Sequence, residues 1–394
     1  MAANMTHDTV RRAPRVFFYV QHLLGIGHLA RASRIARALG EDGFAVTMVT
    51  GGTPVAGFPG PGMRHVALPT IVAGDAGFSG IADAEGRPVD DAFKARRTQM
   101  LLDAFQETAP DIVVIEAFPF GRRQVRFELL PLLAAIEAMN PRPRVVTSLR
   151  DILQERSKPG RDEETVALVK AHFDRVLVHG DPSFARIEET FPLAGEIADR
   201  IVYTGIVAAP PPAPPTETFD IVVSAGGGAV GRDVIRAACD AARAIPEVGS
   251  WCLITGPNLP QADFDALAAE APAGVSLVRF RQDFASLLAG AKLSVSQAGY
   301  NTVCDILRAG CRSLLVPFTA GGETEQPVRA RRLEAMNIAS VLTEADLTAA
   351  SMTQKIREAL SRPKPPAYAL DLDGAQRSAA VLRSLLPAPI LPSE

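Results

Sequence analysis

Short apolar runs alternate with amphipathic segments along the chain, and this alternation limits the possible folds more than any other feature. The first run, residues 15–21, is rich in β-forming residues, and residues 28–43 follow it with apolar side chains at helical spacing and glycines at the end. Further strand-like runs are found at 44–52, 111–118, 143–149 and 174–180, with a helical segment at 91–109. Strands separated by helices in this way favour a parallel sheet covered by helices.

A proline-rich segment divides the chain into two halves that share this pattern. Residues 208–218 (AAPPPAPPTET) are too rich in proline to join the interior of a sheet. A second proline-rich break at 361–368 precedes a last helix near 373–386. Between the two breaks, strand-like runs resume at 219–228, 250–256, 274–280, 291–299 and 311–318, with helical segments at 231–245, 300–309 and 323–336.

These boundaries predict an α/β protein with two Rossmann-like, doubly wound parallel-sheet domains that face a cleft. In such sheets ligands bind outside the carboxyl ends of the strands, so residues that directly follow strands are the candidates for function. We expect a disordered tail (1–14), an N-terminal domain (15–207), a linker (208–218), a C-terminal domain (219–361) and a C-terminal helical segment (362–394) that can cross back to the N-terminal domain.

The overall composition excludes several classes of protein. The 394 residues include 41 basic and 44 acidic residues, a formal net charge of −3, which provides no large positive field for nucleic acid. Four cysteines do not make a disulfide framework in a chain of this length and indicate reduced thiols. No apolar run reaches the ~20 residues needed to span a bilayer. We therefore expect a cytoplasmic protein that contacts the inner face of a membrane at most peripherally.

The loop after the first strand-like run reads HLLGIGH and leads into the first helix. Gly25 and Gly27 allow a tight turn, and the helix that follows directs its free N–H groups and the positive end of its dipole toward the cleft. His28 in this position can accept a proton near neutral pH, or donate one to a negative ligand. The alternative is that His28 merely caps the turn.

A glycine-rich turn follows the first strand-like run of the second half. Its sequence, SAGGGAVGRD (224–233), places Gly226, Gly227 and Gly228 before a helix, where they can cradle a phosphate group. The turn matches the dinucleotide-binding pattern G-x-G-x-x-G only loosely, and the next strand-like run lacks the acidic residue that binds ribose in that pattern. This difference counts against a nicotinamide cofactor.

Two further loops carry residues suited to sugar hydroxyls. Gly299 precedes a helix that holds Asp305 one turn in, where a carboxylate can accept two hydrogen bonds from a ribose diol. The loop after the run 311–318 ends in Glu-Thr-Glu-Gln at another helix start, where adjacent acceptors and donors suit vicinal hydroxyls. Each acid also has a plainer interpretation, because acidic residues favour the positive end of a helix. The candidate binding residues in these loops are Gly299, Asn301, Thr302, Asp305, Gly321, Gly322, Glu325 and Gln326.

Arginines alternate with apolar side chains in the segment FPFGRRQVRFELL (118–130). Arg122 and Arg123, with Arg150 after the run 143–149, can form a basic rim for an anionic or lipid-linked substrate. Equally, these arginines can be solvated or paired with local acids. The sequence leaves the two interpretations open.

The order of these features along the chain resembles that in the GT-B glycosyltransferases. The features are the glycine turn, the acid one turn into a helix, and Gly-Gly followed by Glu-Gln after VPF. The similarity is closest to family 28, the group of the peptidoglycan N-acetylglucosaminyltransferase, and to a bacterial subgroup with GIGH, FPFGRR and GGG-x-VG stretches. It covers most of the chain and is strongest over residues 219–342. The resemblance implies that the C-terminal domain holds a nucleotide-sugar donor and the N-terminal domain an acceptor.

The resemblance also assigns roles to individual residues. It places Asp305 at the ribose, Glu325 and Gln326 at the donor sugar, and the glycines 226–228 at the diphosphate. His28 matches the histidine of the family's GGTGGH loop, from which HLLGIGH departs by keeping only two glycines.

The implied reaction is an inverting, metal-independent transfer of a hexose-type sugar from a nucleotide-diphosphate sugar, by family habit a UDP-sugar, to a small-molecule or lipid-linked acceptor hydroxyl. Helix starts and backbone N–H groups offset the phosphate charge, so no metal and no cofactor are expected. The Asp-x-Asp of DLDG (371–374) lies outside any nucleotide loop. The general base is either His28 or Glu116, which lies near the end of the run 111–118.

Two other functions fit the same architecture. Nucleotide-sugar hydrolases carry a GxGHxxR loop, which GIGHLAR (25–31) matches, and they use water in place of an acceptor. A non-catalytic nucleotide-sugar-binding protein would bind the donor without turnover. The presence of both halves in one chain favours a self-sufficient transferase.

Overall fold

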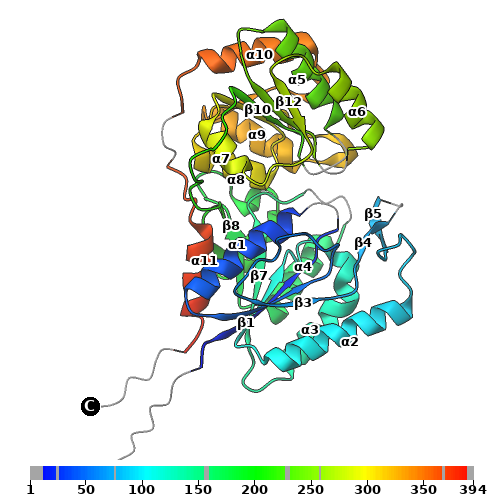
Figure 1. The fold of residues 1–394 in the computed structure, drawn as a ribbon. Helices are drawn as coiled ribbons and strands as arrows, with labels where there is room; N and C mark the ends of the chain where they lie inside the picture. Colours follow the sequence, from blue (N-terminus) through cyan, green and yellow to red (C-terminus); the bar gives the residue numbers. More distant parts are fainter. Residues whose placement is uncertain are drawn as a thin grey trace, which may run out of the picture.

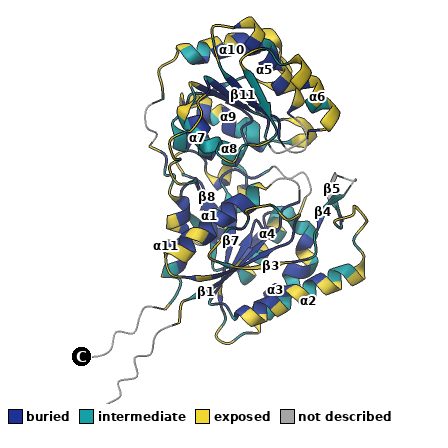
Figure 2. Ribbon diagram, viewed as in Figure 1, coloured by how far each residue is buried: buried dark blue, intermediate teal, exposed yellow. Residues whose placement is uncertain are grey.

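Two parallel sheets form the frame of the molecule, one in each half of the chain (Figure 1). The computed structural model describes residues 12–23, 26–74, 77–154, 159–226, 231–256, 259–365 and 369–387. The central strands of both sheets are largely buried, and helices cover both faces (Figure 2). The prediction of an α/β protein with two doubly wound domains is confirmed.

The N-terminal sheet has seven strands in the order β3-β2-β1-β6-β7-β8-β9. All pairs in it are parallel; β6 is the central strand, and β1 lies beside it, between β2 and β6. Its strands are β1 (Arg15–Val20), β2 (Ala45–Thr50), β3 (Arg64–Ala67), β6 (Ile112–Glu116), β7 (Arg144–Arg150), β8 (Arg175–His179) and β9 (Ile201–Tyr203). A short antiparallel pair, β4 (Val72–Gly74) and β5 (Gly77–Ala82), stands beside the sheet.

The C-terminal sheet has six strands in the order β12-β11-β10-β13-β14-β15, again all parallel. The order reverses between β10 and β13, which is the point in such sheets where ligands bind. Its strands are β10 (Ile221–Ser224), β11 (Trp251–Ile254), β12 (Val275–Val278), β13 (Leu293–Ser296), β14 (Ser313–Leu315) and β15 (Ser340–Val341).

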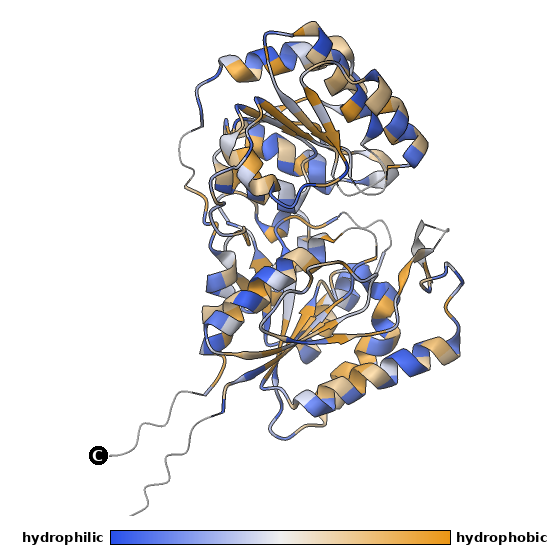
Figure 3. Ribbon diagram, in the orientation of Figure 1, coloured by the Kyte–Doolittle hydropathy of each residue, from blue (hydrophilic) through white to orange (hydrophobic). Residues whose placement is uncertain are grey.

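Helices cover both faces of each sheet, and their outer faces are exposed (Figure 2). The central strands are strongly apolar, whereas the helices alternate apolar and polar faces (Figure 3). The helices are α1 (Gly27–Glu41), α2 (Asp91–Thr108), α3 (Arg126–Glu137), α4 (Arg161–His172), α5 (Arg232–Ala244), α6 (Gln261–Glu270), α7 (Phe284–Gly290), α8 (Tyr300–Ala309), α9 (Glu325–Ala335), α10 (Ala349–Ser361) and α11 (Gly374–Ser384). Short 3-10 turns are η1 (Arg123–Val125), η2 (Ile187–Glu189), η3 (Pro192–Ile197), η4 (Ala320–Gly322) and η5 (Glu344–Asp346).

The last helix, α11, packs on the N-terminal sheet and lies beside α1 (Figure 1). Ala379 and Leu382 share a buried cluster with Leu39 of α1 and the strands below it. The entry of α11 is tight, because a Cβ on Gly374 would lie 2.3 Å from the backbone oxygen of Gly205. The chain therefore crosses between the halves twice, once through the irregular segment 208–218 and once before α11.

The structure differs from the sequence prediction at the margins of the sheets. The short outer strands β3, β9 and β15 and the β4–β5 pair were not predicted. β3 is mostly exposed and β9 is only partly buried, so their sequences lack the continuous apolar run that identifies a central strand. Among the described residues, no helix is long and apolar enough to cross a membrane.

Candidate functional site

The starts of two helices, one from each half, meet where the two sheets face each other. Gly27 opens α1 after β1, and Asn301 lies in the first turn of α8 after β13. The side-chain Nδ2 of Asn301 donates a hydrogen bond of 3.2 Å to the backbone oxygen of Gly27. We call this region, where the carboxyl ends of the strands of both sheets approach each other, the junction. Gly25 lies outside the described residues.

His28 and Glu116 form a hydrogen-bonded pair at the junction. His28 is the second residue of α1, and Glu116 is the last residue of β6, the strand paired with β1. Their Nδ1 and Oε1 atoms are 2.9 Å apart, although 88 residues separate them in sequence. The Glu116 side chain is fully buried, whereas that of His28 keeps 15% of its surface exposed. No described residue hydrogen-bonds the Nε2 atom of His28, which is the atom left for a ligand.

Three side chains hold Glu116 as a carboxylate. The Arg31 guanidinium donates to Oε1, and the Ser148 hydroxyl donates to Oε2 at 2.5 Å. Burial acts to raise the pKa of Glu116, but the charge of Arg31 and the hydrogen bond from His28 outweigh it and lower this pKa to about 2. Burial and the nearby charge of Arg122 lower the pKa of His28 to about 3. At neutral pH the pair is therefore a carboxylate and a neutral imidazole.

A second histidine, His179, is linked to Glu116 through the Ser148 hydroxyl. We call these hydrogen-bonded side chains the network. The Nε2 atom of His179, at the end of β8, is 2.8 Å from Ser148 Oγ, and its Nδ1 is 2.8 Å from Thr204 Oγ1. Burial lowers the pKa of His179 to about 3. Because Ser148 donates to the carboxylate, its oxygen must accept from His179, which fixes the proton of His179 on Nε2.

Tyr300 ties this network to the C-terminal half. It is the first residue of α8, and its hydroxyl donates to the backbone oxygen of His179 at 2.8 Å and accepts from the backbone N–H of Val207 at 2.9 Å. The guanidinium groups of Arg31 and Arg329 lie over its ring, 5.3 and 5.6 Å from the centroid. The Tyr300 ring thereby contacts one buried arginine from each half of the chain.

On the donor side, Asp305 and Glu325 pair with arginines. Asp305, in the second turn of α8, is 3.3 Å from Nη2 of Arg34 on α1, and burial raises its pKa. Glu325, the first residue of α9, lies 2.6 Å from Arg150 and 2.7 Å from Arg329. Arg34 and Arg150 belong to the N-terminal half, so these pairs cross the junction. The assignments of both acids to a donor remain predictions.

The remaining donor-side candidates surround these acids. Gln326 Oε1 accepts from the backbone N–H groups of Ala298, at 3.1 Å, and Phe318, at 3.2 Å. Gly299 is the N-cap of α8 and Thr302 lies in its first turn. Gly226, Gly321 and Gly322 have φ angles of 77°, 69° and 77°, which favour glycine. Gly227 and Gly228 lie outside the described residues.

The arginines of the 118–130 segment separate into two kinds. Arg123 and Arg126 both pair with Glu164 on α4. Arg122 instead belongs to the junction, where its Nε donates to the backbone oxygen of Gln21 at 2.7 Å. The Asp-x-Asp residues Asp371 and Asp373 each pair with an arginine, and no cluster suited to a metal occurs in the part of the chain that the structure describes.

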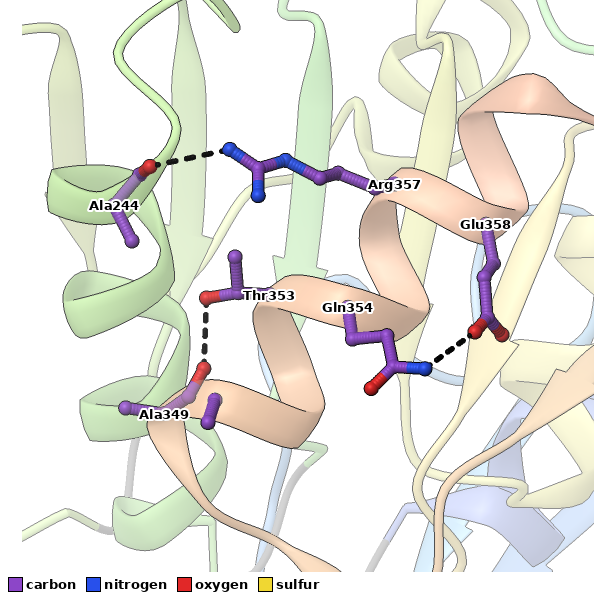
Figure 4. A pocket seen from close by; sticks show the side chains of 7 residues that line it. Ala244, Ala349, Thr353, Gln354, Arg357 and Glu358 are labelled. Carbon is purple, nitrogen blue, oxygen red and sulfur yellow. Dashed lines mark hydrogen bonds between the residues drawn. The ribbon is translucent and has the colours of Figure 1, made fainter.

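The sequence patterns predicted no role for Ser148, His179, Tyr300 or Arg329. Ser148 and His179 lie at or near the carboxyl ends of β7 and β8, the strands that follow Glu116 in the sheet. A polar residue at the end of a buried strand was the signal available for both. A surface pocket is found elsewhere, between α5 and α10 of the C-terminal half, lined by residues such as Thr353, Gln354 and Arg357 (Figure 4).

The fold and the junction define a protein of the GT-B type, in which two doubly wound domains present their strand ends to each other. Residues 221–378 match the family described as "Glycosyltransferase family 28 C-terminal domain". The chain therefore has the GT-B fold, and its C-terminal half is similar to the C-terminal domain of family 28 glycosyltransferases.

Two relatives are both named UDP-N-acetylglucosamine--N-acetylmuramyl-(pentapeptide) pyrophosphoryl-undecaprenol N-acetylglucosamine transferase. The Agrobacterium fabrum protein is 28% identical over 214 residues, which is 50% of this chain and 56% of that protein. The Phenylobacterium zucineum protein is 26% identical over 352 residues, which is 86% of this chain and 87% of that protein. The first match thus spans little more than half the length of the relative.

Solved structures show the same fold at low sequence identity. The glycotransferase of kitacinnamycin has a TM-score of 0.66 at 14% identity and covers 96% of this chain and 100% of its own. MurG of Acinetobacter baumannii has a TM-score of 0.59 at 16% identity, covering 94% and 100%. LpCGTa in complex with UDP has a TM-score of 0.53 at 15% identity, covering 94% of both chains.

Proposed function

We propose that this chain transfers a hexose-type sugar from a UDP-sugar to an acceptor hydroxyl, with inversion at the anomeric carbon and without a metal ion. The observation that carries this proposal is the hydrogen bond of 2.9 Å between His28 Nδ1 and the carboxylate of Glu116. It holds the imidazole with its proton on Nδ1 and its lone pair on Nε2. A carboxylate that fixes the tautomer of a histidine base also stabilises the imidazolium that forms in the reaction.

In the proposed step, Nε2 of His28 removes the proton of the acceptor hydroxyl as its oxygen attacks the anomeric carbon. The bond from that carbon to the diphosphate oxygen breaks, and the nucleoside diphosphate leaves with the electron pair. Between the two candidates for the base, the contacts favour His28. Glu116 is fully buried and engaged by three side chains, so it acts by positioning the imidazole.

The donor is proposed to bind against the C-terminal half. Asp305 would accept hydrogen bonds from the ribose, Glu325 and Gln326 would contact the sugar, and the N–H groups at the starts of α5 and α8 would face the diphosphate. Asp305 and Glu325 are paired with Arg34 and Arg150. Donor binding would therefore exchange these ion pairs for ligand contacts, which requires movement at the junction.

The choice of UDP and of the acceptor class rests on the relatives. The name of these relatives contains a UDP-sugar and an undecaprenol-linked acceptor, and the structure of LpCGTa was solved in complex with UDP. A lipid-linked acceptor, reached peripherally at the inner face of a membrane, is accordingly the first acceptor to test, followed by small molecules.

The decisive experiment incubates the protein with a panel of nucleotide sugars, with and without a lipid extract, and follows nucleotide release by mass spectrometry. Release that depends on the extract, with a new glycosylated product, supports the transferase. Release of free sugar without an acceptor would identify the hydrolase described above. Donor binding without turnover across a broad acceptor panel would instead indicate a nucleotide-sugar-binding protein. If the protein neither binds nor turns over any nucleotide sugar of the panel, the proposal is overturned.

A further inference from the structure

The junction contains one arginine whose charge no acid of the described chain neutralises. Arg31 pairs with Glu116, Arg34 with Asp305, Arg150 with Glu325, and Arg329 with Asp151 and Glu325. Arg122 has the hydrogen bond from Nε to the backbone oxygen of Gln21, and no described residue pairs with its two Nη atoms. A buried Nη atom without a partner would be an unsatisfied donor, and neither Nη atom of Arg122 is one. Both Nη atoms therefore lie at the accessible surface, where a ligand can reach them.

The surroundings of Arg122 are unfavourable for a cation. Burial, and next the positive charge of Arg150, lower the pKa of Arg122 to about 10, and Arg31 acts in the same direction. Glu116 is the nearby acid, but its oxygens are occupied by Arg31, His28 and Ser148. A partly buried guanidinium beside two others is costly unless an anion compensates it.

The backbone presents Arg122 in an unusual conformation. Its φ and ψ angles are 57° and 32°, in the left-handed region that residues other than glycine and asparagine seldom adopt. Ala117, in the same loop after β6, also has a positive φ of 65°. Such conformations concentrate at ligand-binding sites. Arg122 lies close enough to His28 for its charge to lower the pKa of that imidazole, whereas its neighbours Arg123 and Arg126 pair with Glu164.

We propose that Arg122 is the anion-binding residue of the junction and holds a phosphate group of a substrate next to the His28 imidazole. The planar guanidinium with two free Nη atoms suits two oxygens of one phosphate. A bound phosphate would also offset the positive charge that, after burial, most lowers the pKa of His28. Anion binding by Arg122 does not depend on which reaction the protein catalyses. That the bound phosphate belongs to a substrate rests on the proposed function.

The phosphate has two possible sources, and binding measurements separate them. The probes are inorganic phosphate, UDP and uridine, titrated calorimetrically into the full chain in a phosphate-free buffer. The variant is Arg122→Asn, because asparagine tolerates the left-handed conformation and removes the charge. The matched control is Arg126→Gln, which removes an arginine of the same segment that pairs with Glu164. Arg122→Lys keeps the charge, and circular dichroism verifies that each variant is folded.

We expect inorganic phosphate to bind the wild type and Arg126→Gln equally and Arg122→Asn at least about tenfold more weakly, with Arg122→Lys between them. If Arg122→Asn also binds UDP more weakly but binds uridine as the wild type does, Arg122 holds the donor diphosphate. If the affinity for UDP is unchanged in Arg122→Asn, and the wild type binds phosphate and UDP at the same time, Arg122 holds a phosphate of the acceptor. Equal phosphate binding by all variants, or none by the wild type, would overturn the proposal even if the chain proves to be a transferase. Loss of phosphate binding in Arg122→Asn would support it even if the transferase assay failed.

Discussion

The two sides of the junction are built from the same fold but carry different chemistry. All six histidines of the chain lie before the proline-rich segment 208–218, and none lies after it. On the N-terminal side, the pair of His28 and Glu116 is complete within one domain. On the C-terminal side, Asp305 and Glu325 have partners from the other domain. The comparison teaches that the histidine–carboxylate pair is preformed within one domain, whereas the two acids of the C-terminal side are held by ion pairs that cross the junction.

The largest expected effect concerns the preformed pair. His28→Gln should lower turnover by roughly 10²- to 10⁴-fold, the usual contribution of a general base, while UDP affinity stays within about twofold. The measurement is steady-state kinetics on the donor and acceptor found in the panel, with calorimetry for UDP. His65→Gln, which changes a more exposed histidine on β3, serves as the control. Unchanged turnover in His28→Gln would show that His28 is not the general base.

A smaller effect is expected on the opposite side. Asp305→Asn should weaken UDP binding by about 10- to 100-fold, because hydrogen bonds to a charged group contribute roughly 1.5–3 kcal/mol. Since Arg34 pairs with the same carboxylate, Arg34→Gln should leave UDP affinity unchanged or raise it. Calorimetry with UDP and uridine measures both. If Asp305→Asn binds UDP like the wild type, the ribose lies elsewhere and the contrast between the two sides is wrong.

The smallest expected effect is a pH dependence of stability confined to the histidine-bearing side. The folded-state pKa of His179 is lowered by burial to about 3, below its ordinary value of 6.5, so the unfolded chain takes up the proton first. Stability is then full above pH 6.5 and falls as the pH drops from 6.5 toward 3. His28 acts in the same direction. Between pH 6.5 and 5 each contributes about 1–2 kcal/mol.

Urea unfolding at pH 7.5 and 5.0 measures this dependence. His179→Asn should lose less stability between the two pH values than the wild type, whatever its absolute stability. His172→Gln, a partly exposed histidine on α4, should keep the wild-type dependence. An identical loss in His179→Asn and the wild type would show that this histidine is not held neutral in the folded state.

The sequence allowed the central strands to be predicted because burial imposes a pattern on them. Residues 111–118 read as a strand, and β6 (Ile112–Glu116) is buried at every position. The outer strands escaped prediction because a short, partly exposed strand needs no such pattern, as in β3. His28 and Glu116 were both identified, since each comes after or at the end of a recognisable strand. Ser148 and His179 were overlooked, although each is polar and lies at or near the end of an apolar run.

By itself, the sequence determined the fold class, the two-domain division and which loops follow the strands, because strand burial and helix periodicity are local properties of the chain. Only the tertiary structure decided which candidates meet. The parallel pairing of β1 with β6 brings His28 to Glu116 across 88 residues, and the approach of α8 and α9 brings Arg34 to Asp305 and Arg150 to Glu325. Such contacts depend on strand order and domain packing, and no local pattern in the sequence records either.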